Sequence, residues 1–435
     1  MSFADTFFFK HKVNTEWSRR EIVFFGLLGI GLSIVIAYLV AVGLWLVAFG
    51  LLAALPIFVL LHRYPFAGVF VWMLLTPFLV ATDGGSIRKV YWLIHRSLPP
   101  LTIVIILLSS MLHIHKRRLP KLGWPELAMM GYLIVSEASV IYLSNSVMAT
   151  TYYVYDRIFV PMCLYLLIRF TNPSEKDLRR LFPVFIFIVV SQSIIGILSW
   201  SAPQVLPSAW LTRAGSRTTG SLRAYSVFTT SLAFCGYLIL QSALNHKLSK
   251  TVRGLFYFLF ILSYFMIFLS FSRGSWLASI VALLGTAVLY PRFVWRLLLT
   301  VTPIVIIALS VGLLSAEAQR ASHRFYSAES EEAALSRLPI YYASYRMFEA
   351  KPLFGWGYGN FDRFDRLFQV RVGELISPVK DHASHNLYLT FAAEQGFIGL
   401  FLFLAPMLWW LIKSIKAFPK LPPEGFWSRK LLVIF

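Results

Sequence analysis

The stretch Asp381-His-Ala-Ser-His-Asn-Leu-Tyr-Leu-Thr-Phe-Ala-Ala-Glu-Gln-Gly-Phe-Ile-Gly-Leu400 joins a long polar segment to an apolar run that extends to residue 412. An apolar run of this length predicts a helix that crosses a membrane. His385 and Asn386 stand where the polar segment ends and this helix begins. Because histidine titrates near neutral pH, with an ordinary pKa of about 6.5, His385 is a candidate general base at the membrane boundary.

The composition of the whole chain indicates an integral membrane protein. Of its 435 residues, 58% are hydrophobic and only 14% are charged, and the mean hydropathy is +0.69. Cys163 and Cys235 lie in apolar runs and are expected to be buried packing residues. Apolar runs of about 20 residues, the length that a helix needs to cross a bilayer, predict about twelve transmembrane helices, at residues 21–39, 42–61, 65–81, 98–114, 125–143, 154–170, 181–200, 224–244, 254–272, 274–290, 297–315 and 386–412.

The distribution of Lys and Arg predicts the orientation of these helices, because short cytoplasmic loops carry an excess of both. Basic residues ahead of the first apolar run place the N-terminus in the cytoplasm, and the order of helices then places residues 316–384 outside. Some basic residues lie in short outside segments and contradict the rule: Arg88, Lys89, Arg96, Arg157, Arg213, Arg217, Arg223 and Arg273.

Three of these arginines are candidates for binding an anion. Arg217, Arg223 and Arg273 stand beside Gly, Ser or Thr, as in Arg217-Thr-Thr-Gly220 and Ser272-Arg-Gly-Ser275, where the backbone can open toward a ligand. A guanidinium group matches the geometry of a phosphate and keeps its charge in a site of low dielectric. We therefore expect a phosphate or pyrophosphate ligand on the outer face, whereas the basic residues near the third predicted helix are expected to reach lipid headgroups.

The predicted helices and the long polar segment divide the chain into three parts. Residues 1–315 hold eleven transmembrane helices, residues 316–384 form a partly helical periplasmic loop domain, and residues 385–435 hold the twelfth helix and a cytoplasmic tail or the start of a further segment. Within the loop domain lies the glycine-rich run Lys351-Pro-Leu-Phe-Gly-Trp-Gly-Tyr-Gly-Asn-Phe361. Its aromatic side chains either pack on the membrane surface or stack on a sugar, and packing is the expectation.

The polar residues indicate a transfer reaction that needs no metal ion. The sequence has no Asp-x-Asp pair, Walker loop or Gly-x-Ser-x-Gly elbow, so neither a metal site nor a cofactor is expected. His385 can take the proton from an acceptor hydroxyl while the arginines stabilise a departing pyrophosphate. His382 and Asp381 can orient His385, and the Asn386 amide can hold the start of the helix. Glu394 is expected to have a pairing role inside the membrane.

Four motifs together resemble the O-antigen ligase and polymerase superfamily of bacterial inner membranes. They are Ser272-Arg-Gly-Ser-Trp-Leu-Ala278, Pro352-Leu-Phe-Gly-Trp-Gly-Tyr-Gly-Asn-Phe361, His385-Asn-Leu-Tyr-Leu and Glu394-Gln-Gly-Phe-Ile-Gly399. The resemblance covers about residues 210–412. It implies a GT-C-like membrane fold with one large periplasmic loop, and metal-independent transfer of a glycan linked to undecaprenyl pyrophosphate.

The resemblance also implies roles for individual residues. His385 corresponds to the catalytic histidine, Arg273 to the arginine of the Ser-Arg turn, and Arg217 to the arginine ahead of the preceding helix. The family has a Gly-x-x-x-Asn-Pro run where this chain reads Gly220-Ser-Leu-Arg-Ala-Tyr-Ser226. Arg223 is therefore a second candidate for binding the pyrophosphate.

An O-antigen ligase is the function that the residues and the resemblance favour. Such an enzyme moves the glycan from undecaprenyl pyrophosphate to a sugar hydroxyl of the lipid A core, on the periplasmic face of the inner membrane and with inversion at the anomeric carbon. The expected partners are this donor, this acceptor and membrane lipids, with no nucleic acid. The alternatives are an O-antigen or exopolysaccharide polymerase, a protein oligosaccharyltransferase and, least favoured, a transporter of an anionic lipid, which the lack of an internal repeat argues against.

Overall fold

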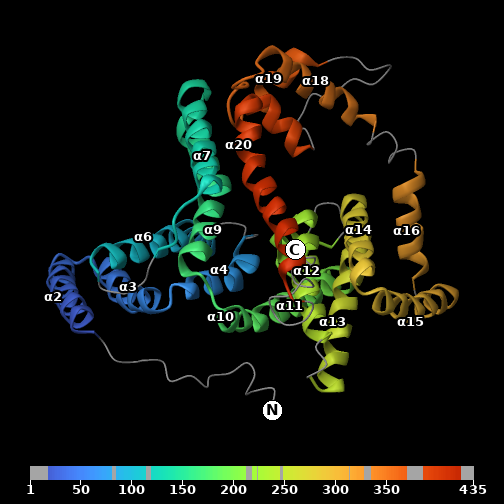
Figure 1. Ribbon diagram of the computed structural model, residues 1–435, viewed down its shortest axis with the longest axis horizontal. Coiled ribbons are helices and arrows are strands. Elements are labelled where there is room, and N and C mark those ends of the chain that lie inside the picture. Colours follow the sequence, from blue (N-terminus) through green and yellow to red (C-terminus); the bar gives the residue numbers. More distant parts are fainter. Residues whose placement is uncertain are drawn as a thin grey trace. The chain divides into compact units, whose positions relative to one another are not determined.

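The computed structural model describes residues 18–80, 85–113, 119–211, 218–222, 224–244, 248–312, 314–327, 335–369 and 386–422. All regular secondary structure in these ranges is helical (Figure 1). Contacts along the chain define two compact units. The first comprises residues 1–79, 84–121 and 160–184, and the second comprises residues 80–83, 122–159 and 185–435.

The first unit consists of mostly apolar helices: α2 (Arg19–Ala41), α3 (Trp45–Arg63), α4 (Phe66–Leu79), α5 (Gly85–Trp92), the π-helical turn η1 (Leu93–Ser97), α6 (Leu98–Met111), α9 (Val160–Thr171) and α10 (Glu175–Arg180). α3, α4 and α9 pack on α6, and α2 packs on α3. The segment Pro56–Arg63 of α3 meets α4 at an angle of 117°. This pair is therefore one broken span or a re-entrant turn.

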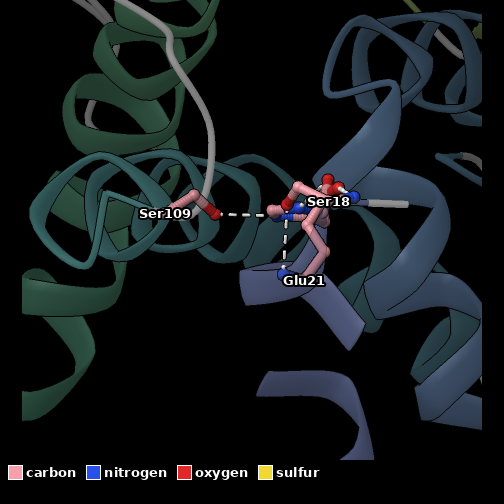
Figure 2. Close-up of polar contacts among 4 residues, drawn as sticks. Ser18, Glu21 and Ser109 are labelled. Atoms are coloured by element: carbon pink, nitrogen blue, oxygen red, sulfur yellow. Dashed lines mark hydrogen bonds and ion pairs between the residues drawn. The ribbon is translucent and has the colours of Figure 1, made fainter. Parts of the chain in front are cut away.

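A buried polar cluster joins the ends of three helices in this unit. His62 of α3 places its Nδ1 atom 2.8 Å from Ser109 Oγ of α6 and its Nε2 atom 3.3 Å from Glu21 Oε1 of α2 (Figure 2). Ser18 caps α2, because its hydroxyl accepts from the Glu21 amide while its own amide donates to the Glu21 carboxylate at 2.7 Å. The apolar window of α2 buries none of its residues in the structure, so this cluster is its polar attachment to α3 and α6.

The second unit contains a first group of helices: α11 (Phe182–Ser201, from Phe185 onward), η3 (Pro203–Val205), η4 (Ser208–Trp210), η5 (Gly220–Leu222), α12 (Tyr225–Ala243), α13 (Lys250–Leu269), α14 (Arg273–Leu289), α15 (Pro291–Ser310) and α16 (Ser315–Tyr326). α12 and α13 form the most extensive helix pair, and α14 packs on both. The hydroxyl groups of Tyr237 and Tyr264 lie 2.6 Å apart between them.

A second group in this unit carries the C-terminal part of the chain: α7 (Trp124–Leu143), α8 (Val147–Val154), the π-helical turn η2 (Tyr155–Phe159), α18 (Arg337–Ala350), α19 (Phe361–Phe368), α20 (Leu387–Ala417) and η6 (Phe418–Lys420). α20 packs on α7 and α18, and also contacts α19 (Figure 1). Its N-terminal half therefore has protein on more than one side.

The all-α, multi-pass membrane fold expected from the sequence is confirmed. Eight helices in the described part of the chain are long and apolar enough to cross a membrane, or nine if the bent pair is one span. The sequence predicted about twelve spans, and four of them account for the difference. Two, at 42–61 and 65–81, form the bent pair, the span at 154–170 is divided by η2, and α14 is a shorter apolar helix. The GT-C-like arrangement and the domain limits at residues 316 and 385 stay predictions.

Candidate active site

α20 is interrupted near its start by one non-helical residue. Gly396 has φ 63° and ψ −164°, so its neighbours lose hydrogen bonds along the helix. The run Lys351–Phe361, called here the glycine loop, supplies replacements. These are Trp356 N to Ala393 O (3.0 Å), Gly357 N to Glu394 O (2.6 Å), Phe397 N to Pro352 O (2.7 Å) and Ile398 N to Leu353 O (3.2 Å). The break is thus a docking site for a loop that is distant in sequence.

Two glycines allow the backbones to approach this closely. A Cβ atom on Gly396 would overlap the carbonyl group of Leu353, and one on Gly355 would overlap the carbonyl group of Glu394. Both glycines also have positive φ, a conformation that side chains of L-residues disfavour. The contact between loop and helix therefore has no room for a side chain at either position.

The buried carboxyl group of Glu394 binds the same loop. Its Oε1 atom accepts a hydrogen bond of 2.9 Å from the Phe361 amide, and the carboxyl group also accepts from the Gly359 amide. Glu394 is only 5% exposed. The expected pairing role is thus performed by two backbone amides, and the Arg157 guanidinium adds a favourable electrostatic interaction.

The glycine loop and the broken helix are both attached to α7. The hydrogen bonds are Tyr358 N to Ser139 Oγ (3.0 Å), Asn360 Nδ2 to Leu143 O (3.2 Å) and Gln395 Nε2 to Ser136 Oγ (2.7 Å). α7 therefore holds the loop and the helix in one register.

The aromatic residues of the glycine loop pack inside the protein. Tyr358 and Phe361 are buried, and the Trp356 ring contacts aromatic rings of α19. Burial raises the pKa of Tyr358, whereas the Arg157 guanidinium, which hydrogen-bonds the Tyr358 hydroxyl, acts in the opposite direction. Packing was the expectation, but its partner is protein and not the membrane surface.

Asn386 caps the N-terminus of α20. Its side-chain oxygen accepts hydrogen bonds from the amides of Tyr388 (3.1 Å) and Leu389 (3.2 Å). An amide that holds the helix start was expected at this position, and these contacts provide it. His385, the predicted catalytic residue, precedes Asn386 directly but lies outside the described residues, as do His382 and Asp381.

Arg273 begins α14 and is partly exposed. Its helix start is built by hydroxyl groups: Ser275 Oγ donates to Ser272 Oγ at 3.1 Å and lies 2.8 Å from Thr229 Oγ1 of α12. Space is open beside Gly274, where an added Cβ atom would meet no atom within 4 Å. A guanidinium group next to an accessible helix N-terminus suits the binding of an anion.

The segment Thr218–Leu222 is a buried anchor between the other two candidate arginines. Gln192 Nε2 donates a hydrogen bond to Ser221 Oγ (2.8 Å), and the Ser221 backbone amide donates one to Gln192 Oε1 (3.0 Å). Thr218 N donates to Leu269 O at 3.4 Å, four residues before Arg273. The chain adjoining Arg217 thus lies beside the turn that leads to Arg273.

Arg217 and Arg223 themselves lie outside the described residues, one on each side of this anchor. Of the predicted site residues, the structure describes Arg273 and Asn386. They belong to different groups of helices in the second unit, because Arg273 lies with α12 and α13, and Asn386 lies with α7 and α18. The roles of all these residues in catalysis stay predictions.

Among the residues that the structure describes, no three His, Cys, Asp or Glu side chains gather closely enough to hold a metal ion. Cys163 and Cys235 are free and buried, as expected of packing residues.

Comparison with known proteins finds a family that resembles part of the second unit. Residues 258–404 match the family model described as O-antigen ligase. This part of the chain is similar to the O-antigen ligase family. The matched part includes Arg273, the glycine loop, His385, Asn386 and the break in α20. The match covers less than half of the chain, and it indicates an activity of the O-antigen ligase or polymerase type for this region.

The matched residues start later than the resemblance seen in the sequence, which began near residue 210, so Arg217 and Arg223 are outside the match. No curated protein matches the chain. Sequence reasoning missed the contact between Glu394 and the glycine loop. The available signal was the glycine spacing in both motifs, because alternate glycines allow backbone approach.

Proposed function

We propose that the chain is an inverting, metal-independent O-antigen ligase. It moves the glycan from undecaprenyl pyrophosphate to a sugar hydroxyl of the lipid A core. The protein spans the bacterial inner membrane with its N-terminus in the cytoplasm, and the reaction takes place on the periplasmic face. The observation that carries the proposal is the family match over residues 258–404, since it includes both Arg273 and His385.

In the proposed reaction, His385 accepts the proton of the acceptor hydroxyl as its oxygen attacks the anomeric carbon. The new glycosidic bond forms on the face opposite the leaving group, so the configuration inverts. The bond between the anomeric carbon and the pyrophosphate oxygen breaks, and undecaprenyl pyrophosphate departs with the electron pair. Arg273 and one or both of Arg217 and Arg223 stabilise the charge that develops on the leaving group.

Three features of the structure support this arrangement. The N-terminus of α14 is open beside Arg273, so a phosphate group can reach both the guanidinium and the free amides of the first helical turn. The hydrogen bond from Thr218 to Leu269 brings the segment that follows Arg217 to the same turn. Asn386 caps the helix that follows His385. In the proposed reaction, Asp381 and His382 are assigned the role of orienting the imidazole.

An O-antigen polymerase is the second candidate, because the family match fits both activities. A polymerase would use the same donor and the same groups, with a second glycan on a polyprenyl carrier as the acceptor. The two functions therefore differ in the acceptor and not in the chemistry.

Reconstitution separates the two candidates. The purified protein is placed in liposomes with lipid-linked glycan and lipid A core, in the presence of a chelator. A glycan ladder on the lipid A band is the result expected of a ligase. Longer polyprenyl-linked glycans without lipid A product would overturn the ligase proposal and support a polymerase.

Variants in the same assay test the residues. Arg273→Ala and His385→Ala are each expected to reduce transfer at least 100-fold, in line with the loss of a group that stabilises charge or moves a proton. Arg296→Ala is the matched control, because Arg296 is an exposed arginine of α15 outside the proposed site. Full activity of His385→Ala would remove the proton-acceptor role.

A further inference from the structure

We propose that Glu394 is a positioning residue that fixes the first two turns of α20, and with them the chain at His385. This positioning role rests on the proposed function in one respect, which is that His385 takes part in glycan transfer. Its structural part concerns residues 386–395, which the structure describes.

The orientation of the first turns of α20 depends on contacts with other parts of the protein, because the helix is broken at Gly396. A continuous helix transmits the direction of its C-terminal part to its N-terminus through successive backbone hydrogen bonds. The φ and ψ angles of Gly396 interrupt this series. Residues 387–395 therefore form a short helical segment whose direction depends on contacts from outside α20.

The glycine loop makes contacts on both sides of the break. On the N-terminal side its amides bind the carbonyl groups of Ala393 and Glu394, and on the C-terminal side its carbonyl groups bind the amides of Phe397 and Ile398. The loop thus bridges the two parts of α20. Side-chain contacts of the short segment add to these backbone hydrogen bonds and determine how firmly its direction is held.

Glu394 provides such a side-chain contact with an ionisable group. Its carboxyl group lies on the N-terminal side of the break and binds the amides of Gly359 and Phe361, at the far end of the loop from Pro352. The short segment is therefore held at two separated points of the loop. Gln395 adds a third point through Ser136 of α7.

The position of Glu394 distinguishes this role from direct catalysis. The carboxyl group is buried and is occupied by amide donors of the loop, so it is engaged away from a substrate. Asn386 caps the same short segment at its other end. His385 is joined to Asn386 by a peptide bond, so a rotation of the segment moves the residue assigned to proton transfer. A displacement of about 1 Å can reduce a rate about 100-fold.

A distance measurement tests the structural part without any transfer reaction. Spin labels are attached at Tyr142→Cys on α7 and Tyr388→Cys in the first turn of α20, both exposed positions. The native cysteines are buried and should not react. Glu394→Ala is expected to shift or broaden the distance between these labels. A second pair, Tyr142→Cys with Met407→Cys beyond the break, is the control and should keep its distance.

Kinetics test the consequence for the reaction. Glu394→Ala is expected to lower kcat at least tenfold while the KM for the lipid-linked donor stays within twofold, because the donor is held at α14. Glu394→Gln keeps one acceptor oxygen for the Phe361 amide and should recover at least half of the lost activity on a logarithmic scale. Glu175→Ala on α10, a helix with no buried residues, is the matched acidic control.

The outcomes separate this proposal from the proposed function. An unchanged Tyr142–Tyr388 distance in Glu394→Ala overturns the positioning role, even if activity falls. A wild-type kcat in that variant overturns it as well. If Glu394→Ala does not fold, Glu394→Gln takes its place with the same two measurements. A shifted distance together with full activity of His385→Ala leaves the structural role intact and overturns the assignment of His385.

Discussion

Two buried glutamates, one in each compact unit, are satisfied in different ways. Glu21 is paired with His62 and accepts a hydrogen bond from the amide of Ser18, the N-cap residue of its helix. Glu394 is paired with backbone amides of a loop, the nearest of them 33 residues away in sequence. The first solution joins side chains at the ends of separate helices, while the second joins one side chain to the backbone of a loop. The difference predicts where each unit is sensitive to substitution.

The chemical consequences follow from the partners. His62 and Glu21 are both ionisable, so removal of either changes the charge balance of a buried site. The amides that bind Glu394 cannot titrate, and they depend on the glycine loop keeping its shape. The cluster around Glu21 should therefore respond to side-chain replacement, and the Glu394 contact should respond most to changes in backbone geometry.

The largest effect is expected from Gly396→Ala. The added Cβ overlaps the Leu353 carbonyl group and the residue must keep a positive φ, which together should cost about 4 kcal/mol of unfolding free energy. The measurement is denaturant or thermal unfolding of the protein in detergent. Gly254→Ala in α13 is the control, since its Cβ meets open space and should change stability by no more than about 1 kcal/mol. Equal stability of the two variants would show that the close contact is not needed.

His62→Ala should have the next largest effect. It leaves the Glu21 carboxylate buried without the imidazole, which should cost about 3 kcal/mol, the low end of the range for broken buried pairs, because Ser18 still caps the helix. Adding Glu21→Gln to His62→Ala should recover at least about 1 kcal/mol by removing the buried charge. A double-mutant cycle measures the coupling. Additive losses would mean that the two side chains do not interact.

Asn386→Ala and Ser18→Ala together compare the N-caps of α20 and α2, the helices that carry Glu394 and Glu21. Loss of the two hydrogen bonds at the start of α20 should cost about 1 kcal/mol, similar to Ser18→Ala at the start of α2. Asn386→Asp keeps an acceptor and should retain most of the stability. In the reconstituted assay Asn386→Ala should also lower transfer, whereas Ser18→Ala should not. Equal loss of transfer in both variants would argue against a special role for the start of α20.

Ser109→Ala should have the smallest effect of these changes. It removes a hydroxyl 2.8 Å from His62 Nδ1 but leaves the contact between His62 and Glu21, so the expected loss is about 0.5 to 1 kcal/mol. Thermal unfolding measures it. Ser110→Ala, next to it on α6, is the control for the loss of a hydroxyl. A loss as large as that of His62→Ala would mean that Ser109 and not Glu21 is the main partner of the imidazole.

Much of this could be predicted from sequence because it depends on local patterns. Hydropathy along the chain predicted the helical membrane fold, since a span is defined by consecutive residues. The Asn386 cap was also readable, because a cap binds amides two or three residues away. The motifs placed Arg273 beside Gly and Ser, where the backbone can open toward a ligand. In the structure it is the first residue of α14.

Other features depended on partners that are distant in sequence. Residues 386–412 are apolar enough to suggest one continuous helix, and nothing in the periodicity marks the break at Gly396, because its stability comes from hydrogen bonds to residues 352–357. The number of spans counted in the described residues differs from the sequence prediction for a related reason, since hydropathy does not record the 117° bend between α3 and α4. The binding of Glu394 to the glycine loop likewise required the loop to be in place.

The sequence by itself determined the membrane class, most of the apolar helical segments, the cap at Asn386 and the residues proposed for transfer. Only the tertiary structure decided which backbone groups bind Glu394, how Thr218–Leu222 is anchored beside the turn before Arg273, and where α20 breaks. The physical reason is the range of the interactions. Hydrophobic length and helix caps are set within a few residues, whereas a buried carboxyl group binds whichever amides the folded chain brings to it.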